Sequence, residues 1–411
     1  MKYQNVRGTH DLLGEELQKF QYIEKLIYEI AKLYGFQEIR TPILEFAEIF
    51  EKNVGESTDI VNKEMYIFQG KNEERIALRP EGTAPVVRAL ISNSLTHSLP
   101  LKFFYIGSMF RYERPQKGRQ RQFNQVGFEY LGTNHYTSDV EMILLAIDFI
   151  KKLGITDYQL QINTLGSNTS LNAYKKELVT YLHSVENKLS ADSQTRLQKN
   201  PLRILDSKNE QDQQLLQQAP KISGSLTLED KELFTKVLES LKILNIPYVI
   251  NEKLVRGLDY YSHSVFEVVT NTLGAQGTLI AGGRYNDMIK EMSGPNLGAF
   301  GFAAGLERLA LMLQPINLAP ESVAIITKED EFNNYALQLA NTLRHNNIAS
   351  QYILGKDIKV KLKRTSPKIF KIAIIIGENE YNTKILTVKN LQNGQSTKVE
   401  ETKLQSFLQN S

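Results

Sequence analysis

The residues whose types and spacing suggest chemistry are concentrated between Phe110 and Gly132. Residues 102–112 are rich in aromatic and β-favouring side chains, residues 113–120 include a proline and a glycine, and residues 121–130 return to a strand-like pattern. Because turn residues separate two strand-like runs, this stretch is predicted to form a β-hairpin with a long charged turn.

The returning arm of the hairpin carries a candidate binding floor. Side chains two residues apart on a strand share a face, so Gln125, Gly127 and Glu129 are expected to lie together. An amide, a residue without a side chain and a carboxylate would leave a gap at the centre of that face. A small polar ligand could lie over Gly127 and be hydrogen-bonded from both sides.

The outgoing arm and the turn carry groups suited to phosphate. Arg111 and Glu113 share a face, and the planar fork of a guanidinium group fits a phosphate. The turn adds a basic cluster that suits a nucleic-acid backbone: Arg114, Lys117, Arg119 and Arg121. Taken alone, the same stretch would also suit a solvated hairpin with ordinary surface charge.

Residues 110–125, FRYERPQKGRQRQFNQ, resemble the second signature motif of class II aminoacyl-tRNA synthetases, in the form found in histidyl-tRNA synthetases. Residues 254–262, LVRGLDYYS, resemble the stretch most diagnostic of the histidine enzymes. Residues 294–313 resemble the third motif, and a helix and strand carrying Pro42 resemble the first. The resemblance covers nearly the whole chain. It implies an α+β catalytic domain, the class II synthetase fold, in which helices flank an antiparallel sheet.

Two other stretches have both a structural and a functional interpretation. On spacing alone, Glu81 in LRPEGT is best interpreted as a surface residue that caps the next helix; the resemblance implies instead that Glu81 and Thr83 hold an α-amino group. Tyr260 and Tyr261 suit an imidazole ring, and Arg256 suits a developing phosphate charge. Together with Asp259, the same three residues would equally suit a buried Arg–Asp pair beside core tyrosines.

The region around the third motif is glycine-rich. Residues 277–287, GTLIAGGRYND, are expected to form a short loop that a ligand can approach closely. In the helix that follows, Arg308 departs from the apolar stripe of Leu306, Leu309 and Leu313, which favours a ligand role. By resemblance, Arg308 contacts the phosphates of ATP.

The resemblance implies histidine–tRNA ligation in two steps. Histidine and ATP give histidyl-adenylate and pyrophosphate, and the histidyl group then passes to the 3′ end of tRNA(His). Mg²⁺ accompanies ATP, and the family forms homodimers through the first motif. The resemblance also implies roles for individual residues. The amino end of histidine is held by Glu81, Thr83 and Gln125, and its imidazole is contacted by Glu129 and Tyr261, with Tyr260 and Tyr285 lining the pocket. ATP is bound by Arg111, Glu113, Arg256 and Arg308; the three arginines are catalytic, and Arg256 stabilises the transition state. The tRNA acceptor end is met by Arg114 and Gln116.

Composition limits the alternatives. The 411 residues suffice for two or three domains, and a net charge of +3 permits a nucleic-acid partner without requiring one. The chain has no cysteine and its six histidines lack paired spacing, so neither zinc nor another structural metal is expected. No membrane span and no signal peptide is expected, and a cytoplasmic location is compatible with the lack of cysteine.

Periodicity and turn residues predict the elements that position these groups. They are a helix at 15–34 ended by Gly35, a strand at 36–46 that bends or lies at an edge at Pro42, a meander at 64–83, helices at 84–93 and 138–153, the second capped by Ser138, and a strand at 155–166.

A change in composition at residues 168–245 predicts a separable helical insertion, with helices at 169–186, 208–218 and 228–244. By resemblance, an insertion at this position closes over the tRNA acceptor arm. The catalytic domain that contains it is expected to span residues 1–320.

A linker is expected at 314–320 and a small α/β domain at 321–411, which by resemblance binds the anticodon. A basic run at 356–368, in which Pro367 interrupts any helix, is typical of a solvated face and could also meet an anticodon stem. The basic run departs from the family pattern, so no base-reading residue is assigned there.

Two other functions are compatible with such a fold. One is the non-catalytic regulatory subunit of ATP phosphoribosyltransferase, which typically lacks the C-terminal domain and has degraded motifs. The other is an RNA-binding or structural protein. The intact Arg111, Arg256 and Arg308, together with residues 321–411, favour the ligase.

Overall fold

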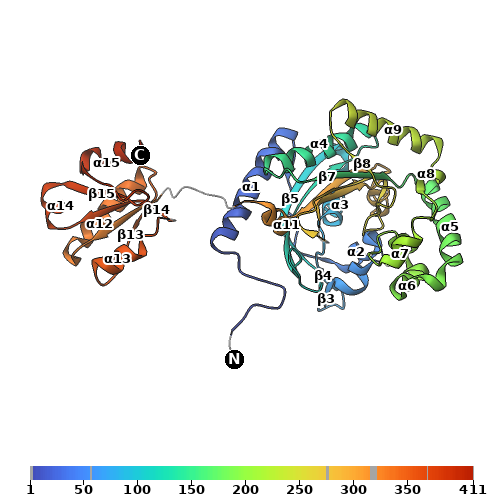
Figure 1. Ribbon diagram of the computed structural model, residues 1–411, viewed down its shortest axis with the longest axis horizontal. Coiled ribbons are helices and arrows are strands. Elements are labelled where there is room, and N and C mark those ends of the chain that lie inside the picture. The colour runs from blue at the N-terminus through green and yellow to red at the C-terminus, as the bar shows by residue number, and fades with distance from the viewer. Residues whose placement is uncertain (1–2, 56–57, 275–276, 315–321, 368, 411) are drawn as a thin grey trace. The chain divides into compact units, whose positions relative to one another are not determined.

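The chain forms two compact units, residues 1–316 and 317–411, each with its own β-sheet (Figure 1). The computed structural model describes residues 3–55, 58–274, 277–314, 322–367 and 369–410. Three features named above lie outside these ranges: residues 315–320 of the expected linker, the boundary after residue 320, and Lys368 of the basic run.

The first unit is built on an eight-stranded sheet of order β1-β5-β6-β11-β10-β9-β7-β8. The outer pairs β1–β5 and β7–β8 are parallel, and the inner neighbours are antiparallel. The expected antiparallel sheet is therefore confirmed, with a short parallel strand added at each edge. The strands are β1 (Gln37–Glu38), β5 (Leu101–Phe110), β6 (Gln122–Leu131), β7 (Gln159–Thr164), β8 (Val249–Ile250), β9 (Ser262–Val269), β10 (Thr278–Arg284) and β11 (Ala299–Gly305).

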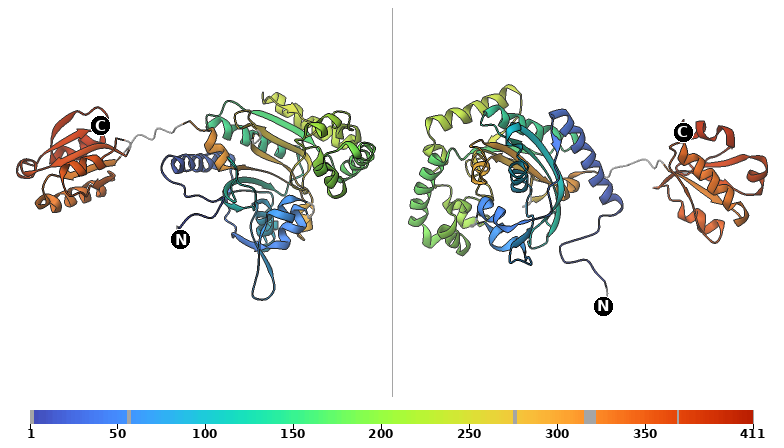
Figure 2. Two further views of the ribbon diagram at one scale, coloured as in Figure 1. Left: turned by 60° about the horizontal axis from the view of Figure 1, so that its bottom comes forward. Right: turned by 180° about the vertical axis from the view of Figure 1, so that it is seen from behind.

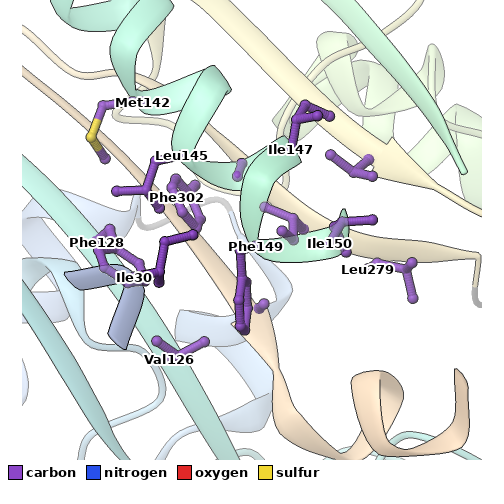
Figure 3. Packing of buried hydrophobic residues seen from close by; sticks show 14 of the residues in the cluster. Ile30, Val126, Phe128, Met142, Leu145, Ile147, Phe149, Ile150, Leu279 and Phe302 are labelled. Atoms are coloured by element: carbon purple, nitrogen blue, oxygen red, sulfur yellow. The ribbon is translucent and has the colours of Figure 1, made fainter. Parts of the chain in front are cut away.

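Four helices pack against one face of this sheet: α1 (Gly14–Tyr34), α4 (Tyr136–Lys152), α9 (Leu228–Ile243) and α11 (Leu306–Met312). Their apolar side chains meet every second residue of the central strands, among them Val126, Phe128 and Phe302 (Figure 3). Because strand side chains alternate, Gln125, Gly127 and the carboxylate of Glu129 lie on the opposite face, as the sequence predicts.

The opposite face carries a second buried cluster and a three-stranded sheet of order β2-β4-β3. The expectation of one strand at 36–46 is wrong, because the chain forms β1 in the large sheet and β2 in the small one. Pro42 lies between them, where its missing N–H would interrupt a continuous ladder. The elements of this region are β2 (Leu44–Phe46), α2 (Ala47–Val54), η1 (Ile60–Glu64), β3 (Tyr66–Gln69), β4 (Arg75–Leu78), α3 (Thr83–Ser92), η2 (Leu95–Ser98) and α10 (Met288–Glu291).

The helical insertion lies along one side of the large sheet (Figure 2). Before α9 it contains α5 (Asn168–Ser184), η3 (Glu186–Lys188), α6 (Ala191–Lys199), η4 (Pro201–Ile204), α7 (Glu210–Leu215) and α8 (Ile222–Ser225). The expectation that it is separable is wrong, because its buried apolar cluster also contains Leu254, Tyr261 and Val265. The insertion and the LVRGLDYYS stretch therefore share one core.

Two local expectations are also wrong. Residues 278–284 form strand β10 within the sheet rather than a loop; Gly282 lies where a Cβ would be 2.3 Å from the backbone oxygen of Gly301. Helix α4 is capped by the ring of His135 rather than by Ser138, whose buried hydroxyl donates to the backbone oxygen of His135 at 2.6 Å. In both cases packing against neighbours overrides the local pattern.

The second unit has a five-stranded sheet of order β13-β12-β14-β15-β16, parallel among its first three strands and antiparallel beyond them. The expected α/β domain is confirmed. Its elements are β12 (Ser322–Thr327), η6 (Asp330–Phe332), α12 (Asn333–His345), β13 (Ser350–Tyr352), α13 (Ile358–Arg364), β14 (Phe370–Ile376), α14 (Glu378–Thr383), β15 (Ile385–Asn390), β16 (Ser396–Glu400), η7 (Glu401–Lys403) and α15 (Leu404–Gln409).

The basic run forms a helix that ends before Pro367, as the expectation that the proline interrupts any helix there requires. Helix α13 starts at the cap Asp357, whose side chain accepts a hydrogen bond from the backbone N–H of Val360 at 2.8 Å, and ends before the proline. Lys361 of this helix is buried, and its amine donates to the hydroxyl of Thr327 at 2.8 Å. The run is therefore partly a packed element and not only a solvated face.

Candidate active site

A cavity of about 810 Å³ lies on the face of the large sheet opposite the α1–α4 layer. A row of small residues crosses this face, because Gly127, Ala303 and Ala281 are register neighbours on β6, β11 and β10. The row continues to larger polar side chains, since Ala281 pairs with Glu267 and Glu267 with Gln161. The small residues make room for a ligand, and the polar ones supply hydrogen-bonding groups beside it.

The space directly over Gly127 is filled by a side chain, so the expectation of a ligand there is wrong. Tyr105 of β5 pairs with Gly127, and a Cβ on Gly127 would lie 2.2 Å from its ring. A Cβ on Gly82 would also clash with the ring, and the phenol donates to the side-chain oxygen of Gln125 at 3.4 Å. The open part of the row is therefore above Ala303 and Ala281, which line the cavity.

The carboxylate of Glu129 lies beneath the cavity and is fully buried. It occupies the space left by Gly301 on the neighbouring strand, and it accepts hydrogen bonds from the hydroxyl of Thr83 at 2.7 Å and of Tyr285 at 2.5 Å. Burial raises the pKa of Glu129 to about 8. Among the described residues no cation pairs with this carboxylate, so a ligand that brings an N–H donor or a positive charge would supply what it lacks.

Glu81 is both the helix cap and a cavity residue. Its carboxylate accepts hydrogen bonds from the backbone N–H groups of Thr83 and Ala84, each at 2.8 Å, at the start of α3. It is 3% exposed rather than a surface residue, and burial raises its pKa while these N–H groups oppose the rise. Glu81, Thr83 and Gln125 all line the cavity, so the structure brings these three predicted residues together.

Three tyrosines form an aromatic cluster beside this group. The rings of Tyr260 and Tyr261 are 4.5 Å apart, and those of Tyr260 and Tyr285 are 5.6 Å apart. Burial raises the pKa of all three phenols, so they remain protonated donors at neutral pH. Tyr260 and Tyr261 line the cavity, whereas Tyr285 lies beneath it with Glu129.

Two of the predicted arginines stand on the cavity wall, each anchored by a backbone oxygen. Arg111 donates to the carbonyl of Pro80 at 2.8 Å and lies over the ring of Phe123. Arg308 donates to the carbonyl of Thr278 at 2.9 Å, and burial lowers its pKa below the ordinary value for arginine. Anchoring by a neutral carbonyl group orients each guanidinium toward an anion without cancelling its positive charge.

Arg256 is held differently, by a carboxylate and an aromatic ring. It forms an ion pair with Glu267, and its guanidinium lies 5.6 Å from the centroid of the Tyr261 ring. The alternative of an Arg–Asp pair is wrong, because Asp259 instead accepts from the side chain of Asn200 at 2.9 Å. The Nε of Arg256 is a buried polar atom without a hydrogen-bond partner among the described residues, which marks a place for an acceptor from a ligand.

The hairpin turn is only partly brought to the cavity. Glu113 lines the cavity. Its carboxylate pairs with Arg119 at 3.0 Å and with Arg111 at 3.8 Å. Arg114 and Gln116 are exposed and lie outside the lining residues. The structure therefore places the ATP-site candidates together and leaves the two acceptor-end candidates on the turn beyond them.

Sequence reasoning missed several lining residues. Glu267 carries a recoverable signal, because it lies at the end of the small-residue row once strand register is known. Many of the others come from the insertion, from β7 and from the turn after β8, where no motif marks them: Gln161, Arg203, Asp206, Ser207, Lys208, Gln213, Asn251 and Lys253.

Within the described residues, no group of three or more histidine, aspartate and glutamate side chains is arranged to hold a metal ion. Across the same ranges, every helix is too short or too polar to cross a bilayer.

Comparison with known proteins accounts for both units. Residues 8–309 match the family model of histidyl-tRNA synthetase, and residues 322–411 match that of an anticodon-binding domain. A histidine–tRNA ligase of Wolbachia pipientis from Culex pipiens is 45% identical over 396 residues, covering 96% of this chain and 97% of the relative.

Solved structures agree. The apo histidyl-tRNA synthetase of S. aureus has a TM-score of 0.82 at 34% identity, covering 99% of this chain and 100% of that chain. A Bacillus halodurans structure described as an ATP phosphoribosyltransferase regulatory subunit/histidyl-tRNA synthetase has a TM-score of 0.68 at 24% identity, covering 92% and 98%, which shows the fold alone. The chain therefore belongs to the histidyl-tRNA synthetase family, whose members are aminoacyl-tRNA ligases.

Proposed function

We propose that the cavity activates L-histidine with ATP and then transfers the histidyl group to tRNA(His). One observation carries the proposal: a single cavity is lined by the buried carboxylate of Glu81, by Tyr260 and Tyr261 and by several arginines, among them the three predicted ones, and the buried Glu129 and Tyr285 lie beneath it. Histidine is an ammonium, a carboxylate and an imidazole, and ATP is a polyanion, so these groups match the two substrates in charge and in hydrogen-bonding character.

At the amino-acid end, the ammonium group of histidine binds among Glu81, Thr83 and Gln125. The two oxygens of Glu81 already accept backbone N–H groups, and each retains a further lone pair for the ligand. The imidazole faces Tyr261 and points toward Glu129, with Tyr260 and Tyr285 around it. A ring N–H can then add a third donor to Glu129, and a side chain without such a donor would fill the space without giving the carboxylate a new partner.

At the ATP end, Arg111 and Arg308 hold the phosphates, with Glu113 beside them, and Arg256 faces the α-phosphate. An oxygen of the histidine carboxylate attacks the α-phosphorus, the bond to the bridging oxygen breaks, and pyrophosphate leaves. No enzyme nucleophile is required. Catalysis then depends on alignment of the two substrates and on stabilisation of developing negative charge by fixed guanidinium groups.

Mg²⁺ enters with ATP in this proposal. Hard oxygen ligands suit the ion, and Glu113 and Glu267 are carboxylates on the cavity wall. Both already pair with arginines, so they would complete the coordination that the phosphates begin rather than form a separate metal site. When bound, the ion neutralises phosphate charge.

The first test is histidine-dependent ATP–pyrophosphate exchange by the purified chain. We expect exchange with histidine and none above background with the other amino acids, because histidine alone brings an imidazole N–H to Glu129. Charging of tRNA(His) transcript by the same preparation checks the second step. Well-folded protein that neither exchanges pyrophosphate nor charges tRNA would rule the proposal out.

Transfer requires the tRNA acceptor end to reach the cavity. We assign the exposed Arg114 and Gln116 of the hairpin turn to this contact, and the second unit to the anticodon arm. The proposed location is the cytoplasm, because protein synthesis there uses the charged tRNA.

Homodimer formation is proposed through the small sheet. Its outer strands expose large apolar side chains that a monomer would leave in water, with Leu44 55%, Phe46 54% and Phe68 49% exposed. Contiguous exposed apolar surface of this kind is typical of a protein interface.

The double variant Leu44→Glu, Phe46→Glu is expected to convert the dimer to a monomer of 46.9 kDa. Losing the burial of two large apolar side chains removes about 3–6 kcal/mol of association free energy, before the penalty of burying two charges. Analytical ultracentrifugation measures the mass. Ile250→Glu is the control, because Ile250 is 48% exposed on β8 at the opposite edge of the large sheet. A double variant that sediments at twice the monomer mass would contradict this interface.

The alternative is a regulatory subunit of ATP phosphoribosyltransferase, since one solved structure of the same fold is described as an ATP phosphoribosyltransferase regulatory subunit/histidyl-tRNA synthetase. Three cavity-wall arginines and a second unit that matches an anticodon-binding domain are features that a purely regulatory protein does not need. Absence of exchange, together with binding to ATP phosphoribosyltransferase, would favour it.

A further inference from the structure

The turn that carries Arg256 is held from two sides. On one side lies the end of helix α2: the backbone N–H of Asp259 donates to the carbonyl of Val54 at 3.0 Å, and Gly55 leaves room for the Asp259 side chain. On the other side, Leu254 and Tyr261 are part of the apolar core of the insertion. The position of the turn therefore depends on the position of the insertion.

Polar contacts from the insertion segment 200–203 reach the same turn. The side chain of Asn200 donates to Asp259 at 2.9 Å. The guanidinium of Arg203 is divided between two acceptors: one terminal nitrogen donates to the carbonyl of Gly257 at 3.1 Å, and the other lies 3.6 Å from a carboxylate oxygen of Asp59. Arg203 thus ties the residue next to Arg256 to the segment that precedes η1.

The side chain of Arg203 is suited to holding the turn and does not contribute to the apolar core of the insertion. It lines the cavity wall and is 19% exposed, whereas the apolar core of the insertion is built by its neighbours Ile204 and Leu205. Only a planar fork can reach the two acceptors at once. Contacts at this level of exposure are individually weak, so Arg203 supplements the apolar core that the insertion shares with the turn.

We propose that Arg203 is a positioning residue for histidine activation. By holding the carbonyl of Gly257 and the carboxylate of Asp59 together, it fixes the turn that presents Arg256 to the reacting phosphate. This inference rests on the proposed function, since it concerns the rate of the activation step.

The test compares Arg203→Ala with wild-type protein in histidine-dependent ATP–pyrophosphate exchange. Loss of one charged anchor predicts a fall in kcat of about tenfold. The KM values for ATP and histidine should change by less than about threefold, because Arg203 touches neither substrate in the proposed arrangement. Guanidinium ion at tens of millimolar should restore activity to Arg203→Ala, since it can occupy the vacated fork, and Arg203→Lys should recover only part of the rate.

Two further variants keep the test decisive. Lys199→Ala removes the same charge from the neighbouring exposed position and should stay within about twofold of wild type. Asn200→Ala removes the side-chain contact to Asp259 and should give a smaller fall in kcat of the same kind. Unchanged kcat in folded Arg203→Ala would overturn the proposal. A fall that comes with a lower melting temperature and is not rescued by guanidinium would also overturn it, because the role would then be structural. Exchange by wild-type protein tests the proposed function independently of these comparisons.

Discussion

Arg256→Ala is expected to lower kcat for histidine-dependent exchange by about 10²–10³-fold, the range found when one fixed donor to transition-state charge is removed. The expectation rests on the surroundings of the guanidinium group. It is fixed by Glu267 and by the face of Tyr261, and its Nε points to no acceptor among the described residues. A donor held in place before the reaction stabilises the transition state without reorganising during it.

The result depends on separating catalysis from folding. Removing Arg256 alone leaves Glu267 partly buried without its partner, which can destabilise the fold. The double variant Arg256→Ala, Glu267→Gln removes that charge as well, and should recover the melting temperature but not the exchange rate. Arg75→Ala is the matched control, because Arg75 pairs with Glu51 at 2.8 Å on the exposed small sheet, outside the cavity. Exchange within about tenfold of wild type in Arg256→Ala would contradict the assigned role.

The sequence predicts the parts of the site that depend on one strand or one helix. Alternation alone places Gln125 and Glu129 on one face, and the departure of Arg308 from its apolar stripe is by itself enough to indicate a ligand role. Helix α1 also follows from periodicity, with Gly35 at its end in the left-handed conformation at a φ of 73°. These features are local, and local pattern suffices for them.

What the sequence does not predict depends on register and packing between segments far apart. Tyr105 fills the space over Gly127 only because β5 and β6 pair in one register, and Arg256 meets Glu267 only because the turn before β9 folds back over the sheet. Arg203 lies in a polar, motif-free segment, and its role follows only from where the insertion core places it. Strand alternation says which residues share a face, but not which residue of another strand crosses over them.

Glu129→Gln is expected to stabilise the protein and at the same time to impair it. Burial raises the pKa of Glu129 from 4.5 to about 8, so the folded state binds a proton more tightly than the unfolded state does. The stability that this proton contributes is fully present below pH 4.5, and it is lost as pH rises through about 8. The interval between the two pKa values corresponds to at most about 5 kcal/mol, at 1.36 kcal/mol per pKa unit.

Glutamine cannot ionise, so the variant should lose this pH dependence. Urea unfolding at pH 6 and pH 9 should show wild-type stability falling between the two values, and the variant should be the more stable protein at pH 9. Glu239→Gln makes the same chemical change at an exposed position on α9 and should leave the wild-type pH dependence intact. A parallel pH dependence in Glu129→Gln and wild type would show that another group is responsible.

The cost of the added stability should appear in histidine recognition. A hydrogen bond to a charged partner contributes about 1.5–3 kcal/mol, so replacing the carboxylate by an amide should lower kcat/KM for histidine by roughly 10- to 100-fold, with the KM for ATP little changed. Above about pH 8 the ionised carboxylate, held by two hydroxyl groups, destabilises the free protein, and that penalty is relieved when an imidazole N–H arrives. Unchanged kcat/KM in the stabilised variant would show that Glu129 is a structural carboxylate and that the imidazole lies elsewhere in the cavity.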